Sequence, residues 1–305
     1  MKPFFHIFIL SYNRCSYISE TIDSILAQTF NDFKITVLDN SSTDDTLLVL
    51  KNYDIDVVHH KENIGVLNNI LKASHYCKSD WLMIFHDDDL LHPEYLMHAH
   101  KKIIENPDCS LIGCDYLETK SPNHTQWQTL HNDCFNFINA THFASFCYTK
   151  NKIHFASAIY KLNNFSKIPG DFSKYGKLCD RPILIEGMGE GQAYVFKYPY
   201  IQYRNHPEQD SQSPTSGPFL DQAISLSRFF KLKMGDCWNT ASGKTFILNN
   251  RSYLRYLYKW CSDRDSISFF SFVKKAIHLN AGNKLSYCPR PIIRLFRNHY
   301  FKRYP

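Results

Sequence analysis

The first 118 residues alternate between short apolar runs and stretches with helical periodicity, and this alternation leaves few folds open to the chain. Strands that alternate with helices predict an α/β fold, a doubly wound, mostly parallel sheet with helices on both faces. Ser16 precedes the first helical stretch and is expected to cap it. The expected strands are 4–10, 33–40, 56–60, 81–85 and 110–117, and the expected helices are 17–28, 41–53, 64–77 and 93–104.

The pattern loosens after residue 118. Residues 119–155 are polar and aromatic, and we expect loops there with one helix near 140–148. Residues 196–203 form a strand pattern interrupted by Pro199, which favours an edge strand because proline cannot donate to a sheet ladder. From residue 219 onward the pattern is mostly helical, which predicts a helical extension at the C-terminal side.

Polar residues gather where the predicted strands end. Tyr12, Asn13 and Arg14 follow the first strand, Asp39 and Asn40 follow the second, and Asp87, Asp88 and Asp89 follow the fourth. Ligands of doubly wound sheets bind outside the carboxyl ends of the strands, so three clusters on one edge predict a binding site. The chain contains no GxGxxG and no GxxxxGK[ST] motif, which argues against the usual dinucleotide and P-loop sites.

The run Asp87-Asp88-Asp89 places three like charges side by side. A hard divalent cation would relieve their repulsion, since Mg²⁺ and Mn²⁺ prefer carboxylate oxygens and keep several positions for water or phosphate. A solvated acidic turn is the alternative. The two other clusters on the same edge favour the metal site.

Six motifs in order, "ILSYNR", "VLDNSSTDDT", "ENIG", "HDDDLLHPEYL", "CDRPIL" and "YRNHPEQDS", resemble those of the family 2 glycosyltransferases with the GT-A fold. The resemblance covers about residues 4–211. It implies transfer of a sugar from a nucleotide-diphosphate donor, favouring a UDP-sugar, with Mg²⁺ or Mn²⁺ and with inversion at the anomeric carbon. It further implies a nucleotide-sugar-binding half at 1–118 and an acceptor-binding, catalytic-base half at 119–218, followed by a basic, aromatic helical region at 219–305.

The resemblance also implies roles for individual residues. The family's usual proline before the first cluster is missing here, and His86 stands where the first acid of the metal motif is expected. Asp88 is then the best metal ligand, with His206 as a second ligand and Asp89 as a further candidate. The residues implied in donor binding are Ser11, Tyr12, Asn13, Arg14, Asp39, Asn63, Gly65, Asp87 and Arg204.

A Glu-Asp pair usually supplies the catalytic base in the family, and the corresponding pair here is Cys179-Asp180. The resemblance therefore implies that Asp180 is the base. The alternative is a surface salt bridge between Asp180 and its neighbour Arg181.

Charge is unevenly distributed along the chain. The net charge is +6, yet residues 251–305 hold twelve Lys/Arg and two acids, a local charge of +10. Basic residues mixed with aromatic ones predict an anionic partner, and an anionic membrane surface is favoured over nucleic acid. The family implies an acceptor that is a glycan or an undecaprenyl-diphosphate-linked glycan of a surface polysaccharide, such as O-antigen (lipopolysaccharide) or capsule.

Ten cysteines are scattered without a CxxC motif, which predicts a reducing compartment. The apolar run at 4–10 is too short for a signal peptide, and no run of 18 apolar residues occurs. We therefore expect a cytoplasmic protein, peripheral on the inner face of the plasma membrane. Two other classes stay open: a non-catalytic nucleotide-sugar-binding scaffold, and a nucleic-acid-binding protein that uses the basic tail.

Overall fold

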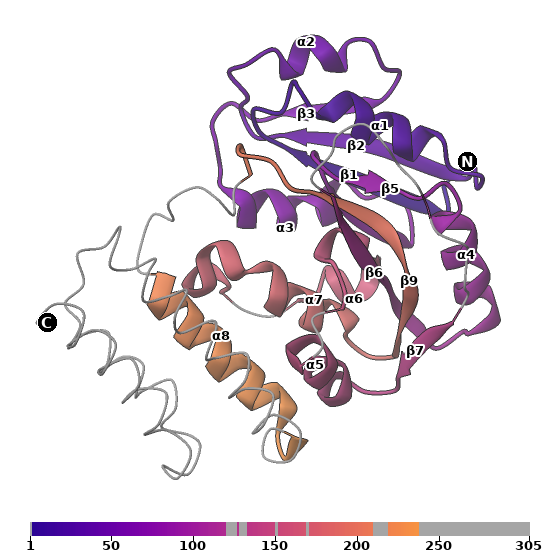
Figure 1. Ribbon diagram of the computed structural model, residues 1–305, viewed down its shortest axis with the longest axis vertical. Helices are drawn as coiled ribbons and strands as arrows, with labels where there is room; N and C mark the ends of the chain where they lie inside the picture. The colour runs from indigo at the N-terminus through magenta and orange to yellow at the C-terminus, as the bar shows by residue number, and fades with distance from the viewer. Residues whose placement is uncertain are drawn as a thin grey trace, which may run out of the picture.

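The computed structural model describes residues 2–119, 127, 133–149, 152–168, 171–209 and 219–237 (Figure 1). One nine-stranded sheet has the order β3-β2-β1-β4-β8-β6-β9-β5, with β7 paired to β9. The strands are β1 (Phe5–Ser11), β2 (Phe33–Asp39), β3 (Asp56–His59), β4 (Trp81–His86), β5 (Leu90–Leu91), β6 (Cys109–Thr119), β7 (Cys134–Phe137), β8 (Ile159–Lys161) and β9 (Gln192–Arg204). The α-helices are α1 (Ile18–Leu26), α2 (Thr46–Leu50), α3 (Val66–Tyr76), α4 (Tyr95–Glu105), α5 (Ala140–Thr149), α6 (Leu162–Phe165), α7 (Asp180–Met188) and α8 (Phe219–Met234), and the 3-10 helices are η1 (Phe155–Ser157) and η2 (Ser173–Leu178).

The first four strands form a parallel block, as the alternation predicted. β1 lies between β2 and β4, and β2 pairs with β3. The register sets Ser11 opposite Asp39 and Leu10 opposite His86. The polar residues that follow these strands therefore begin at one edge of the sheet.

The second half of the sheet is mixed. β8 runs antiparallel between β4 and β6, while β6 and β9 are parallel. The prediction of an edge strand at 196–203 was wrong, because β9 lies between β6 and β5. Pro199 is tolerated there because it faces Asp115 at a register shift, where the ladder is interrupted and an N–H donor is not required.

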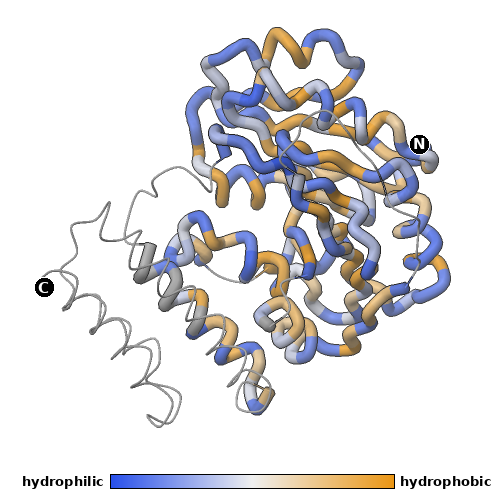
Figure 2. Tube along the Cα trace, viewed as in Figure 1, coloured by the Kyte–Doolittle hydropathy of each residue, from blue (hydrophilic) through white to orange (hydrophobic). Residues whose placement is uncertain are grey.

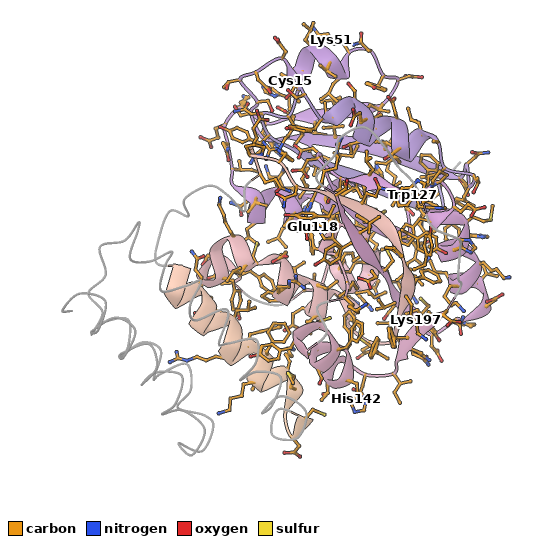
Figure 3. All side chains as sticks on the ribbon, viewed as in Figure 1. Cys15, Lys51, Glu118, Trp127, His142 and Lys197 are labelled. Carbon is orange, nitrogen blue, oxygen red and sulfur yellow. The ribbon has the colours of Figure 1, made fainter. Side chains whose placement is uncertain are left out.

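Helices cover both faces of the sheet, as expected. One buried cluster joins alternate β1 residues to α1, α2 and α4, and the other joins the opposite face to α3, α5, α7 and α8. Figure 2 shows hydrophobic stretches along the strands, and Figure 3 shows side chains filling the space between the sheet and the helices. Each fully buried large apolar side chain in these layers contributes roughly 1.5–3 kcal/mol to folding.

Two helix ends differ from the sequence-based expectation. Ser16 does not cap α1: Tyr17 occupies the N-cap without a side-chain bond, and the N–H groups of Tyr17 and Ile18 both donate to the Arg14 carbonyl. The helix expected at 41–53 is confined to Thr46–Leu50. It begins late because Ser41 has φ of +66° and the Asp44 carboxylate accepts the Thr46 N–H at 3.0 Å.

Helix α8 packs on the second half of the fold. The ring of Phe230 lies 4.9 Å from that of Tyr148 in α5, and Phe229 lies 5.9 Å from Tyr175 in η2. The predicted basic tail, residues 251–305, lies outside the described residues. Within the described part of the chain, no helix is both long and apolar enough to cross a bilayer.

Candidate functional site

The turn after β1 is fixed to the loop that follows β2. Asn13 adopts φ of +54°, its N–H donates to Ser42 Oγ at 2.9 Å, and its side-chain oxygen accepts the Thr43 N–H at 2.8 Å. Arg14 N–H donates to Thr46 Oγ1 at 2.9 Å. Asparagine tolerates this left-handed backbone because its short amide can bond locally. The Tyr12–Arg14 cluster is thus held against the second cluster.

Asp39 is fully buried at the end of β2. Its carboxylate accepts the Ser42 N–H at 3.0 Å and the Ser42 hydroxyl at 2.5 Å, and it lies 2.7 Å from His59 Nδ1. The Ser11 hydroxyl beside it in the register is buried without a hydrogen-bond partner. This corner therefore holds a fixed acceptor next to an unsatisfied polar group.

The loop before α3 is tied to the same edge through two asparagines. Asn40 donates to Asn63 Oδ1 at 2.9 Å and accepts the Ile64 N–H at 2.9 Å. Gly65 has φ of +79° and donates its N–H to Asn63 Oδ1 at 2.9 Å. Glycine is required by this conformation, which other residues adopt only with strain.

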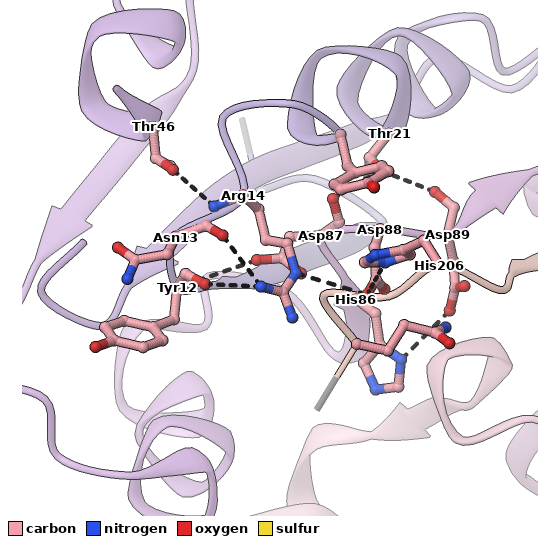
Figure 4. Close-up of polar contacts among 12 residues, drawn as sticks. Tyr12, Asn13, Arg14, Thr21, Thr46, His86, Asp87, Asp88, Asp89 and His206 are labelled. Atoms are coloured by element: carbon pink, nitrogen blue, oxygen red, sulfur yellow. Dashed lines mark hydrogen bonds and ion pairs between the residues drawn. The ribbon is translucent and has the colours of Figure 1, made fainter. Parts of the chain in front are cut away.

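The three carboxylates after β4 point to different partners (Figure 4). Asp87 accepts the Tyr12 N–H at 3.0 Å. Asp88 Oδ2 lies 3.1 Å from His206 Nε2. Asp89 is fully buried and its Oδ2 lies 3.3 Å from His86 Nδ1. The three carboxylates therefore point toward different partners, which lessens their mutual repulsion.

Cationic side chains partly offset the repulsion. Arg14 Nε lies 3.6 Å from Asp87 Oδ1 and 3.7 Å from Asp88 Oδ2. Even so, burial and the charge of Asp88 raise the pKa of Asp87 to about 8, against the opposing effect of Arg14. Burial also raises the pKa of Asp89. The raised pKa values show that burying these carboxyl groups close together disfavours their charged forms, and a bound cation would reverse that effect.

His86 has the opposite tendency. Burial alone would lower its pKa, but the interaction with Asp89 and the charges of Asp88 and Asp87 raise the pKa to about 9. The residue that replaces the family's first acid is therefore a proton-holding partner of Asp89 when no other cation is present.

Arg204 joins the end of β9 to α1 and to the carboxylate loop. Its side chain is buried and donates through Nη2 to the Tyr17 carbonyl at 3.1 Å and to Thr21 Oγ1 at 2.9 Å. It also bonds the Asp88 carbonyl through Nε and the Glu20 carboxylate through Nη1. These bonds fix the position of the loop that carries Asp88.

Sequence reasoning missed Thr21 and Tyr17. Thr21 Oγ1 donates to the carbonyls of Asp87 and Asp89 at 3.0 and 2.9 Å, and the Tyr17 ring stacks on His206 at 4.0 Å. A signal for Thr21 was present, because it is a polar residue on the otherwise apolar face of α1. Nothing in the pattern singled out Tyr17.

Asp88 and His206 fit a hard divalent cation. Their nearest ligand atoms are 3.1 Å apart, and adjacent ligands at about 2.1 Å from an octahedral ion lie about 3.0 Å from each other. Both side chains are buried, and His206 Nδ1 has no hydrogen-bond partner. The donor set of one carboxylate and one imidazole leaves most coordination positions for phosphate and water.

Asp180 opens α7, apart from these clusters in the hydrogen-bond network. Its carboxylate is one-third exposed and lies 3.7 Å from Arg181 Nε, so the contact with its neighbour that the alternative reading expected is present. Burial raises the pKa of the Tyr160 hydroxyl well above its usual value, and the charge of Asp180 raises it further. Burial, together with the charges of His86 and Arg181, lowers the pKa of His154 well below its usual value.

The sheet order, the parallel first block and the carboxylate loop define an α/β protein of the GT-A type. Residues 6–169 match the family model "Glycosyl transferase family 2", and the chain belongs to this family.

Several curated proteins are similar over part of their length. An uncharacterized glycosyltransferase of Haemophilus influenzae is 26% identical over 151 residues, which are 43% of this chain and 46% of that protein. The chondroitin synthase of Escherichia coli is 30% identical over 98 residues, 30% of this chain and 14% of that protein. The match therefore spans less than half the length of either relative.

Solved structures share the fold. Residues 1–349 of S. aureus TarS in complex with UDP-GlcNAc align with a TM-score of 0.59 and 14% identity, covering 84% of this chain and 80% of that one. Glucosyl-3-phosphoglycerate synthase from Mycobacterium tuberculosis, in complex with Mn²⁺ and UDP, aligns with a TM-score of 0.51 and 13% identity, covering 76% and 80%.

Proposed function

We propose that this chain is an inverting glycosyltransferase that moves a sugar from a nucleotide-diphosphate donor to a glycan or lipid-linked glycan. The observation that carries the proposal is the meeting of three polar clusters at the carboxyl ends of β1, β2 and β4, with Asp88 and His206 spaced 3.1 Å apart beside them. A nucleotide diphosphate offers a base edge, a ribose and an anionic diphosphate, and the clusters offer matching groups in that order along the edge.

The first two clusters and the α3 loop would bind the base and the ribose. Asp39 accepts from the base edge, and the Ser11–Arg14 backbone lies along it. Asn63 and Gly65 flank the ribose, and Asp87 contacts the ribose or phosphate. A UDP-sugar is the favoured donor, because two of the structural relatives were solved with UDP or UDP-GlcNAc.

The carboxylate loop would bind the diphosphate. Asp88 and His206 would hold Mg²⁺ or Mn²⁺. Asp89, the further candidate from the sequence, directs its Oδ2 toward His86 and His154 instead. Such an ion, when bound, stabilises the charge that develops on the leaving diphosphate. Arg204 belongs to this part of the site, and its four bonds to α1 and to the loop favour a positioning role beside the diphosphate over direct contact.

Asp180 acts on the acceptor. An acceptor hydroxyl attacks the anomeric carbon from the face opposite the diphosphate, and its proton passes to the Asp180 carboxylate. The new bond joins the acceptor oxygen to the anomeric carbon, the bond to the diphosphate breaks, and the configuration inverts. The one-third exposure of Asp180 supports this role, because a base must be reachable by the acceptor.

The relatives support a polysaccharide acceptor. The similar proteins include a chondroitin synthase and a hyaluronan synthase, so a growing surface polysaccharide, as free glycan or linked to undecaprenyl diphosphate, is the favoured acceptor. A polymer of O-antigen or capsule type is consistent with this class.

The basic segment 251–305, at +10, would bring the enzyme to the anionic inner face of the plasma membrane. Co-sedimentation with anionic and neutral vesicles at low and high salt tests the membrane part. Salt-sensitive binding to anionic vesicles alone supports it, and equal binding to both kinds, or none to either, contradicts it.

The transferase proposal is tested by incubating the full-length protein with a panel of nucleotide sugars, Mn²⁺ and polysaccharide acceptors, and by following release of the nucleotide diphosphate and glycan extension. Metal-dependent transfer with inverted product configuration is expected. Nucleotide-sugar binding without turnover on any acceptor, in a protein where Asp180→Asn changes nothing, would favour the scaffold alternative.

A further inference from the structure

A second group of metal-ligating side chains lies behind the carboxylate loop. His86 ends β4, Asp89 lies in the loop, and His154 precedes η1. Asp89 Oδ2 lies 3.3 Å from His86 Nδ1 and 3.7 Å from His154 Nδ1, and all three atoms lie within 4.8 Å of one another. Two strand-adjacent segments far apart in sequence thus converge on one carboxylate oxygen.

The group is left with unsatisfied polar atoms. Asp89 Oδ2 and His154 Nδ1 are both buried without a hydrogen-bond partner, and Asp89 is fully buried. The approach of His86 to Asp89 is an ion pair without hydrogen-bond geometry. A buried polar atom without a partner costs about 1–3 kcal/mol. A ligand that contacts all three atoms would remove this cost.

This group is distinct from the Asp88–His206 pair. Asp88 Oδ2 faces His206, whereas the free oxygen of Asp89 faces His86 and His154. Arg204 lies between the two, since its Nε bonds the Asp88 carbonyl and its N–H lies 3.3 Å from Asp89 Oδ1. An ion behind the loop would therefore be separate from one that binds the donor.

We propose that His86, Asp89 and His154 form a second cation site, specific for a borderline divalent transition metal such as Zn²⁺, Co²⁺ or Fe²⁺. Two imidazoles with one carboxylate suit these ions better than Mg²⁺, which prefers oxygen alone. Ligand atoms about 2.1 Å from a tetrahedral ion lie about 3.4 Å apart, and the spacings of 3.3 and 3.7 Å are close to this value.

The ion would link the two halves of the fold. His86 and Asp89 belong to the half at 1–118, and His154 belongs to the half at 119–218. An ion bound to all three would hold the end of β4 against η1 and fix the backbone that carries Asp87 and Asp88. The competing arrangement is a protonated His86 paired with Asp89, which requires no metal.

The test is a Co²⁺ titration of the metal-stripped, full-length His206→Gln protein without nucleotide, followed by visible absorption. This substitution removes one ligand of the Asp88–His206 pair, so the ion behind the loop is measured by itself. One ion per chain with ligand-field bands and no sulfur-to-metal charge-transfer bands is expected, which separates this site from the ten cysteines. In this protein, adding His154→Gln or His86→Gln is expected to weaken binding at least about 10-fold, while the matched control His75→Gln, at an exposed position in α3, leaves binding unchanged.

Two separate histidine variants are used so that the misfolding of one does not decide the result, and His86 is the more exposed of the two. Thermal unfolding of each variant without metal checks the fold. The proposal is overturned by the absence of stoichiometric Co²⁺ bands, by binding that both His86→Gln and His154→Gln retain, or by a loss of binding that His75→Gln shares. Because the titration uses no donor or acceptor, its failure would leave the transferase proposal untouched.

Discussion

The carboxyl edge of β1, β2 and β4, which is the proposed donor edge, and the start of α7 differ in how firmly their carboxylates are held. Asp39 and Asp89 are fully buried, and Asp87 and Asp88 are bonded to Tyr12 and His206, which follow β1 and β9. Asp180 is one-third exposed and lies in a single loose ion pair. The donor edge is therefore set in position before any ligand binds, whereas the α7 carboxylate is open to solvent. This is the arrangement expected where a fixed site binds the donor and an accessible base meets a separate acceptor.

The largest expected effect is a loss of turnover in Asp180→Asn without a loss of donor affinity. Asp180→Asn should lower turnover by roughly 10²–10⁴-fold, because an amide cannot accept the acceptor proton. Donor affinity should stay near the wild-type value, since a group needed only in the transition state affects turnover more than ground-state binding. Initial rates and nucleotide calorimetry on the same preparation measure both. Near wild-type turnover in Asp180→Asn would remove it as the base.

Asp88→Asn, the matching change on the donor edge, should mainly weaken nucleotide binding, the opposite of what is expected for Asp180→Asn. Asp88→Asn is expected to weaken metal-dependent binding of the nucleotide diphosphate by about 100-fold or more, because even outer-shell partners of a metal are worth 10–100-fold. Calorimetry with UDP and Mn²⁺ is the measurement, and Asp180→Asn serves as its control. Unchanged affinity in Asp88→Asn would show that this carboxylate holds no ion.

The buried His6 in the half that carries the donor edge predicts a pH dependence of the unfolding free energy. His6 in β1 accepts the Lys78 N–H at 3.0 Å and lies 2.8 Å from Thr36 Oγ1, and burial lowers its pKa from 6.5 to about 4. The neutral ring is the folded form, so its contribution is complete above pH 6.5 and is lost as the pH falls toward 4. Relative to a His6→Gln variant, wild type should lose about 2 kcal/mol of unfolding free energy between pH 7 and pH 5. Urea unfolding at both pH values tests this, and parallel pH profiles for the two proteins would contradict it.

The smallest expected effect concerns two glycines that both have a positive φ. Gly65 and Gly235 have φ of +79° and +49°, and a Cβ at either would meet open space. Alanine at each should cost roughly 1–3 kcal/mol in stability through backbone strain, since both have positive φ and Gly65, with ψ of 156°, lies in a region that only glycine adopts readily. Only Gly65→Ala should also weaken nucleotide binding, because Gly65 shapes the α3 loop of the donor edge. Equal nucleotide affinity in the two variants would place the loop outside the site.

The sequence predicted the first half of the fold well because its central strands β1 and β4 are buried on both faces. A strand such as Trp81–His86 is continuously apolar, and the polar residue that ends it is visible in the pattern. The carboxyl-edge clusters followed from the alternation, since parallel strands bring their ends together. The family resemblance then assigned chemistry to residues that the pattern had only located.

The second half was less predictable for physical reasons. Strand β8 has only three residues, too few for a periodic signal, yet it is inserted between β4 and β6. Pro199 marked β9 as an edge strand because a bulge cannot be seen in one sequence. His154 was not singled out, because it lies in a segment without periodicity and meets Asp89 only through tertiary folding. Long-range contacts of this kind leave no local trace.

The most direct test of the central claim, that the fixed donor edge binds a nucleotide sugar through a divalent ion, is thermal unfolding of the full-length protein with a panel of nucleotide sugars, with and without Mn²⁺. At about 100-fold excess over Kd, one or more UDP-sugars should raise Tm by roughly 5 °C in Mn²⁺ and much less without it. The same sugar should leave Tm of Asp88→Asn unchanged. If no nucleotide sugar raises Tm in a metal-dependent way, the donor-site account is contradicted.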